Sequence, residues 1–172
     1  MLKSLHKDVC AEHVYSKIFN TLSKDVYNFL RYKYGDSLNP RDKVQEAFIK
    51  LWDNCKKVTP EKAKYFLFTT ANNMMLNEYK HRKVVLKYQN SNPNTDTTIE
   101  SPEFLMEESE YMKKYQRALA KLTEAQRVAF LMNRVEGKRH KEIAEILGIS
   151  RKGVEKRIYS ALKKLREDIE GI

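Results

Sequence analysis

Glycine and proline are scarce in this chain of 172 residues, which contains five glycines and four prolines. Sheet-rich folds need both residues at their many turns, so a large β-protein is disfavoured. Lys, Glu, Leu and Ala are plentiful, and all four have high helix propensity. Since 41% of the residues are hydrophobic, a packed core is feasible. The composition predicts an all-α protein of one medium domain or two small ones.

Long apolar runs are absent as well. The longest purely apolar stretch, Val128–Met132, is far shorter than the roughly 20 residues that cross a bilayer. The first residues, MLKSLHKDVC, lack the apolar stretch of a secretory signal. We therefore expect a cytoplasmic protein without membrane insertion.

Cysteine is nearly missing, with Cys10 and Cys55 alone and without partner spacing. This pattern disfavours both a disulfide scaffold and a zinc site. We expect two reduced thiols without a specific structural role.

Catalytic and cofactor motifs are not found either. No HExxH, CxxC or GxxxxGK[ST] pattern occurs, and the four histidines are scattered. Asp42 and Glu46 form only an ordinary i, i+4 pair, which is poor support for a nuclease metal site. The sequence predicts no enzymatic activity, no metal and no cofactor.

Charge is abundant and uneven, with a net charge of +10 and a pI near 9.5. Lysine and arginine dominate residues 1–86 and 113–172, whereas residues 87–112 are net acidic. Basic bodies of this kind are typical of nucleic-acid-binding proteins, although general solubility is an alternative reading of charge alone.

Helical periodicity extends over both basic bodies. Apolar residues repeat every four positions from Val14 to Val26, and Gly35 is a plausible stop for that helix. Asn39-Pro40 opens a second helix, and a third is expected over residues 61–87. The second helix has an i, i+3, i+4, i+7 face made of Val44, Ala47, Phe48 and Leu51.

The segment Tyr88–Glu103 is rich in Asn, Thr, Ser and Pro and predicts a linker. We expect a first domain over residues 1–87, an acidic polar linker over 88–109 and a second domain of three or four helices over 110–172.

The stretch Lys141–Arg166 has the pattern of a helix-turn-helix. Gly148 is placed to end one helix with positive φ, and Ser150 to N-cap the next. Gly153 lies inside the second helix, where glycine lowers helix stability relative to alanine. It either allows the backbone to approach DNA closely or is merely tolerated.

The second helix of this motif would present a basic outer face. Residues in the N-terminal half of this helix would contact base edges, and residues further round the helix would contact phosphates. The DNA-contact candidates are Ser150, Arg151, Lys152, Glu155, Lys156, Arg157 and Tyr159. A solvated basic helix is the alternative.

Leu122–Arg166, LTEAQRVAFLMNRVEGKRHKEIAEILGISRKGVEKRIYSALKKLR, resembles region 4 of bacterial sigma factors, with Gly153 replacing the usual Thr. Asp42–Trp52, DKVQEAFIKLW, is similar to region 2.2, and Ala63–Lys83 to regions 2.3 and 2.4. The order and the short linker are similar to the extracytoplasmic-function (ECF) group. The resemblance implies an ECF sigma factor that binds core RNA polymerase and directs promoter-specific initiation.

The resemblance also implies roles for the first domain. Its second helix would bind the β′ clamp coiled coil of the polymerase, while the β flap is a further expected contact. The candidates for core binding are Asp42, Gln45, Glu46 and Trp52. The alternative for Trp52 is packing in the core.

The helix over Ala63–Lys83 is rich in aromatics and amides, which can stack on bases and bind their edges. By resemblance this helix and the preceding loop, Asn54–Pro60, hold the −10 element as a single strand, and region 4 reads the −35 element as duplex. The −10 candidates are Lys56, Lys57, Asn72, Asn73, Asn77, Lys80 and Arg82. Part of this helix is expected to be core, at Phe66, Leu67, Thr70, Ala71 and Met74.

An anti-sigma protein is an expected partner by resemblance, and the acidic linker would pass through the RNA exit path or serve as a tether. Two alternatives stay open. A two-domain helix-turn-helix regulator would bind promoter DNA without core polymerase, and a helical adaptor would bind no DNA.

Overall fold

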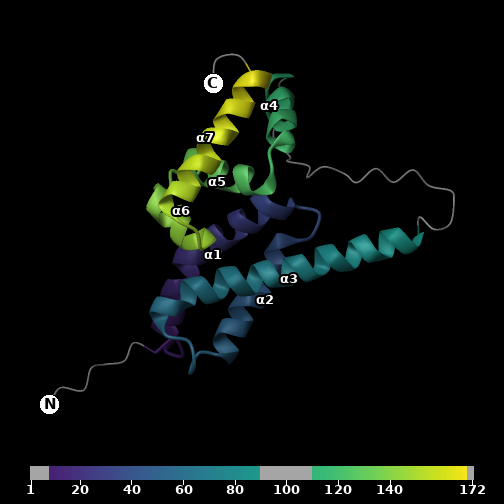
Figure 1. The fold of residues 1–172 in the computed structure, drawn as a ribbon. Coiled ribbons are helices and arrows are strands. Elements are labelled where there is room, and N and C mark those ends of the chain that lie inside the picture. The colour runs from purple at the N-terminus through teal and green to yellow at the C-terminus, as the bar shows by residue number, and fades with distance from the viewer. Residues whose placement is uncertain (1–7, 90–109, 170–172) are drawn as a thin grey trace. The chain divides into compact units, whose positions relative to one another are not determined.

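The computed structural model describes residues 8–89 and 110–169, and within these ranges it contains helices and no strand (Figure 1). The all-α prediction is therefore confirmed. The helices are α1 (Glu12–Tyr34), α2 (Pro40–Asp53), α3 (Pro60–Gln89), α4 (Glu110–Lys121), α5 (Glu124–Arg134), α6 (His140–Leu147) and α7 (Arg151–Asp168).

The described residues form two compact units. The first contains those of residues 1–30 and 38–95, and the second those of residues 31–37 and 96–172. Thus α2 and α3 lie in the first unit with most of α1, and α4 to α7 lie in the second.

The first unit is built around α2 and α3, which pack against each other. The predicted inner face of α2 is confirmed, since Val44, Ala47, Phe48 and Leu51 are all buried. Helix α1 joins this core through edge-on aromatic pairs. Phe19 meets Phe48 with ring centroids 4.9 Å apart, and Phe29 meets Phe68 at 5.3 Å.

The buried stripe of α3 differs in part from the prediction. Leu67 and Ala71 are fully buried as expected, whereas Phe66, Thr70 and Met74 are only half-buried. Ala63, Phe68 and Met75 take the remaining core positions. The stripe is thus rotated by about one residue toward Phe29 of α1, whose ring packs on Phe68.

The ends of α1 and α2 follow the local sequence. Gly35 accepts φ 77°, which ends α1 as predicted. Asn39 has φ 48°, a left-handed conformation that asparagine tolerates better than most residues, and Pro40 then opens α2.

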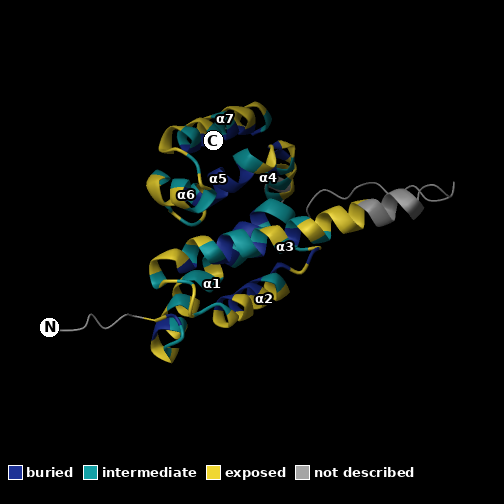
Figure 2. Cartoon of the chain, turned by 60° about the horizontal axis from the view of Figure 1, so that its bottom comes forward, coloured by how far each residue is buried: buried dark blue, intermediate teal, exposed yellow. Residues whose placement is uncertain are grey.

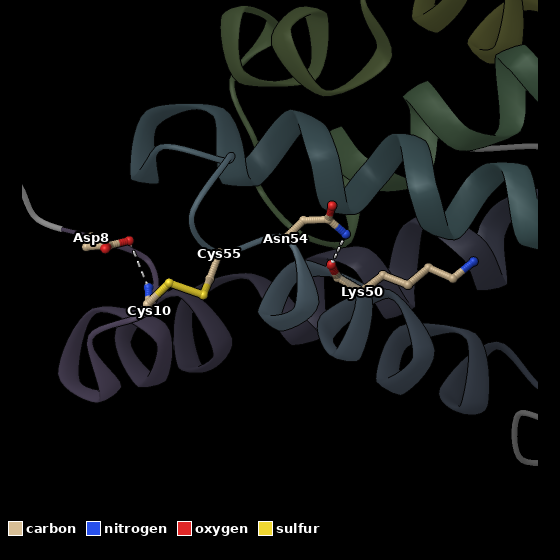
Figure 3. Close-up of a disulfide and its surroundings, with 5 residues drawn as sticks. All are labelled: Asp8, Cys10, Lys50, Asn54 and Cys55. Atoms are coloured by element: carbon tan, nitrogen blue, oxygen red, sulfur yellow. Dashed lines mark hydrogen bonds between the residues drawn. A yellow bond between two sulfur atoms is a disulfide. The ribbon is translucent and has the colours of Figure 1, made fainter.

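The prediction of two free thiols is wrong in this structure. Cys10, just before α1, forms a disulfide with Cys55 in the α2–α3 loop, with Cα atoms 4.9 Å apart (Figure 3). The residues are 45 positions apart in sequence, so their pairing depends on the tertiary fold. The Cys10 amide also donates to Asp8 Oδ1 at 3.1 Å, and the Asn54 side chain donates to the Lys50 carbonyl at 2.8 Å.

The second unit is organised by α7, which packs against α4, α5 and α6. The apolar run Val128–Met132 is buried in α5. A capping box opens that helix: the Gln126 amide donates to Thr123 Oγ1 at 3.3 Å, and the Thr123 amide to Gln126 Oε1 at 3.1 Å.

Arg127 is the buried charged residue of this unit, at 6% exposure. Its Nε donates to the Tyr32 carbonyl at 3.0 Å and its terminal nitrogens to the carbonyls of Leu122 and Lys33, each at 3.4 Å. Burial lowers the pKa of Arg127. The hydrogen bonds to Tyr32 and Lys33 connect α5 to residues 31–37 within this unit.

The predicted linker is described only at its start. Helix α3 continues to Gln89, two residues beyond the expected end of the first domain. The rest of the linker, with its acidic residues, lies outside the described residues. None of the described helices has the length and apolarity that a membrane span requires.

Candidate nucleic-acid interface

The turn between α6 and α7 has the geometry that the sequence predicts. Gly148 has φ 63° and ψ 35°, and the Ile149 amide donates to the Ala144 carbonyl at 3.1 Å. Ser150 then N-caps α7, because its Oγ accepts from the Gly153 amide at 3.1 Å. These bonds fix the angle at which α7 leaves the turn.

Helix α7 buries one stripe and exposes the opposite face. Val154, Ile158, Ala161 and Leu165 are buried. The predicted DNA contacts lie on the other side, where Ser150, Arg151, Lys152, Lys156 and Tyr159 are exposed and Glu155 and Arg157 half-buried. Tyr159 is 72% exposed, which is unusual for an aromatic side chain that serves only packing.

A cationic pocket lies at the N-terminal ends of α6 and α7, and sequence reasoning had not assigned it. Its lining residues are Asn133, Arg139, His140, Lys141 and Arg151. The Arg139 amide is held by Glu142 Oε2 at 2.8 Å, so the start of α6 is well defined. Two helix N-termini and several basic side chains favour a phosphate group at this place.

The four core-binding candidates are all exposed on the outer side of α2, namely Asp42, Gln45, Glu46 and Trp52. Trp52 is 46% exposed, so the alternative in which it is a core residue is wrong. Its ring meets that of Tyr15 edge-on, with centroids 5.1 Å apart, and the Tyr15 hydroxyl donates to the Phe48 carbonyl at 2.9 Å. Burial raises the pKa of that hydroxyl.

The same side of α1 and α2 carries two exposed apolar residues that sequence reasoning missed. Ile49 is 59% exposed and Phe19 42% exposed. The pattern held a signal for both, since each lies off the predicted apolar stripe of its helix. We name this set the α1–α2 face: Tyr15, Phe19, Asp42, Gln45, Glu46, Ile49 and Trp52.

The −10 candidates separate into two places in the first unit. Lys56 and Lys57 are exposed in the α2–α3 loop, whereas Asn73, Asn77 and Lys80 are exposed on α3 at i, i+4 and i+7. Figure 2 shows that the exposed positions of α3 become frequent toward its C-terminal part.

The remaining −10 candidates on α3 have different surroundings. Asn72 is half-buried, and Arg82 pairs with Glu78, with Nε and Oε1 3.6 Å apart. Tyr65, at 70% exposure, and Tyr79, at 47%, are exposed aromatic residues outside the candidate set. Both lie on the face of Asn72 by their i, i+7, i+14 spacing, so α3 combines aromatic and amide groups on adjoining faces.

No group of three or more potential metal ligands occurs among the residues that the structure describes. Two compact helical units, the second with a helix-turn-helix and a basic outer face, define a two-part DNA-binding protein of all-α fold.

Comparison with protein families assigns both parts. The family model described as sigma-70 region 2 matches residues 18–84, and the one described as sigma-70, region 4 matches residues 112–165. The chain belongs to the sigma-70 family of transcription initiation factors. No curated protein matches it.

Eleven chains of solved structures match this one. One is the sigma factor RpoE, from a co-crystal structure with the anti-sigma factor NepR from Bartonella quintana. The TM-score is 0.61 at 17% identity, and the match covers 89% of this chain and 94% of that one. At this identity the likeness shows the fold.

Proposed function

We propose that this sigma factor reads the −35 element as duplex with α7 and holds the −10 element as a melted strand with α3 and the α2–α3 loop. In this proposal the α1–α2 face binds core RNA polymerase at the β′ clamp coiled coil, and the second unit contacts the β flap.

The duplex-reading role is supported by the first turns of α7. Arg151 and Lys152 are exposed at its N-terminus, with Lys156 one turn later. This is the end of a recognition helix that enters the major groove. Arg157 lies further round the helix and is suited to a phosphate.

The observation that carries the proposal is the amide face of α3. Asn73 and Asn77 are exposed one turn apart, with Lys80 after them, and none of them contributes to the core. Amides can bind the edges of unpaired bases, the nearby tyrosines can stack on them, and the lysine can hold the backbone. A regulator that binds only duplex DNA has no use for this face.

Core binding is supported by the exposed Trp52, which Tyr15 holds edge-on. Rigid aromatic residues of this kind often dominate the energetics of interfaces. Since the matched RpoE was crystallised with an anti-sigma factor, we infer that a protein inhibitor also binds this chain.

In vitro transcription with core polymerase on a promoter library tests the whole proposal. We expect specific initiation only when core is present, with one preferred upstream and one preferred −10 sequence. If the chain binds duplex DNA specifically but never associates with core, the two-domain regulator is correct instead.

Variants then test each surface. Trp52→Ala should weaken the association with core about 30-fold or more, as expected for an aromatic hot spot, whereas the exposed-aromatic control Tyr159→Ala should not. Asn73→Ala should reduce the permanganate reactivity of thymines near the start site, whereas Asn20→Ala, an exposed amide of α1, should leave it unchanged. Normal reactivity in Asn73→Ala would contradict the −10 role.

A further inference from the structure

Glu155 is held by two cationic or polar partners from different helices. Its Oε1 accepts from Arg151 Nε at 3.0 Å, and His140 Nδ1, from the first residue of α6, lies 3.5 Å from the same oxygen. An exposed i, i+4 pair by itself is weak. Here a side chain of α6 also lies next to the carboxylate, so the surroundings of Glu155 include residues of both helices.

The contact has a consequence for Arg151, which is 73% exposed at the start of α7. An arginine presents five N–H groups, and a guanine O6/N7 edge is bound by two of them. Because the Nε–H is directed to Glu155, the two terminal nitrogens form the outer end of the side chain. This orientation presents the bidentate fork away from α7.

We propose that Glu155 is a positioning residue for Arg151 and does not itself contact a base. This inference rests on the proposed function, because it requires that α7 reads duplex DNA. It specifies the chemistry of the site: Arg151 selects a guanine, and Glu155 with His140 limits the orientations from which it does so.

The test measures base preference at each upstream position, using full-length chain with core polymerase on a randomised −35 library. Arg151→Ala should abolish one guanine preference. Glu155→Ala should weaken the same preference by about threefold to tenfold, part of the discrimination that an arginine–guanine pair supplies. Glu155→Gln should restore most of it, because the amide oxygen also accepts from Nε–H.

The double variant separates the outcomes. In an Arg151→Ala background, Glu155→Ala should change no base preference. If it still changes one, Glu155 reads a base itself, and the positioning role is refuted. If Arg151→Ala alters preference but Glu155→Ala does not, the positioning role also fails while duplex reading stands. If Arg151→Ala alters nothing, reading by this end of α7 is wrong and the positioning role fails with it.

A second inference comes independently from the disulfide of the first unit. Cys55 lies next to Lys56 and Lys57, in the loop that we propose to contact the −10 strand. Its disulfide to Cys10 attaches this loop to the segment just before α1 (Figure 3). Both cysteines are half-buried, so a small dithiol can reach them. Next to Cys10, Val9 is fully buried, so the other end of the tether is anchored in the core.

The backbone hydrogen bonds of this loop are local and do not connect it to α1. The Cys55 amide donates to the Trp52 carbonyl at the end of α2, and the amides of Lys57 and Val58 both donate to the Asn54 carbonyl. Lys56 and Lys57 are exposed. A covalent tether is therefore a major restraint on where these lysines point.

We propose that the Cys10–Cys55 pair is a redox-sensitive tether that orders the loop for binding single-stranded DNA. A dithiol reduces it by exchange: one thiolate attacks a sulfur of the pair, the S–S bond breaks and one cysteine leaves as a thiolate, and the second thiol of the dithiol then attacks the mixed disulfide and releases the other cysteine. Two electrons and two protons pass to the cysteines, and the dithiol leaves as a disulfide. The DNA-binding part rests on the proposed function.

Hydrogen exchange of the full-length chain, oxidised or reduced with dithiothreitol, tests the tether. On reduction, the amides of Cys55, Lys57 and Val58 should exchange at least about tenfold faster, as expected when local opening becomes easier. Cys10→Ser should exchange at the reduced rate with or without reductant. Equal exchange in oxidised and reduced wild-type chain would refute the tether.

Open-complex lifetime with core polymerase then tests the switch. Reduction should shorten it several-fold in wild type and leave Cys10→Ser unchanged. If loop exchange responds but open-complex lifetime does not, the loop does not hold the strand and the switch is refuted, whereas Asn73→Ala still tests the proposed −10 function separately.

Discussion

Replacing Gly153 by alanine should stabilise the second unit, although the family pattern carries a threonine here. Gly153 is the third residue of α7, where glycine lowers helix stability relative to alanine by up to about 1 kcal/mol. A Cβ at this position would lie 3.4 Å from Ser150 Oγ and 3.6 Å from Ile149 Cδ1, which are ordinary contacts. Since no clash offsets the gain, we expect about 0.5–1 kcal/mol of added stability.

The added methyl group would point toward the turn and not toward the exposed face. Because Ser150 and Ile149 are its nearest neighbours, alanine should leave DNA affinity unchanged within about twofold, a change near the resolution of such measurements. The Ser150 cap also survives, since it uses the amide of residue 153. Glycine would then be tolerated at this position and not required for close approach to DNA.

Hydrogen exchange of the α7 amides gives the stability change for this unit, and promoter binding by the chain with core polymerase gives the affinity. Gly148→Ala is the matched control. It also has space for a Cβ, but its φ of 63° strains any L-residue, so it should destabilise by about 1 kcal/mol. A destabilised Gly153→Ala would refute the reasoning about space, and a large loss of affinity would show that DNA approaches the backbone here.

Further predictions concern the buried and covalent features. Arg127→Met should destabilise the second unit by about 2–3 kcal/mol, because it leaves the carbonyl of Tyr32 without its buried donor, and exchange of α5 amides would report the loss. Cys10→Ser should lower the free energy of unfolding of the first unit by at most about 4 kcal/mol, the loop-closure value for a separation of 45 residues, as measured by denaturant unfolding of oxidised chain. Burial, with the Glu124 carboxylate nearby, raises the pKa of Tyr34 to about 12. Its hydroxyl ionises near pH 10 in the unfolded chain, so its contribution to stability is complete below that pH and is lost as pH rises toward 12, which tyrosinate absorbance with parallel unfolding measurements would detect.

The sequence was sufficient where a local interaction determines the structure. Gly148 and Ser150 define the turn before α7, because positive φ and an N-cap are properties of single residues and their immediate neighbours. The inner face of α2 was also predictable, since only one side of that helix has apolar residues at helical spacing.

Sequence periodicity was insufficient where two stripes compete. On α3, Phe66 and Met74 define one apolar stripe, and Phe68 and Met75 define another beside it. The ring of Phe29, from a different helix, packs on Phe68 and decides between them. Cys10 and Cys55 pose the same problem in a stronger form, because no local property of either thiol indicates a partner 45 residues away.

The α1–α2 face shows why a candidate site can be only partly visible in a sequence. Its polar residues were identified because they follow a family motif. Phe19 and Ile49 lie off the apolar stripes of their helices, but only the fold shows that both are exposed. Exposure of several apolar side chains around Trp52 is unfavourable for an isolated chain, and a partner that covers them would recover that free energy.

Tyr15 supports the Trp52 ring through an edge contact, and its own hydroxyl is fixed on the Phe48 carbonyl. Trp52 would therefore lose little side-chain entropy on binding, which is the physical reason to expect that this residue, more than Asp42 or Glu46, dominates the affinity for core polymerase.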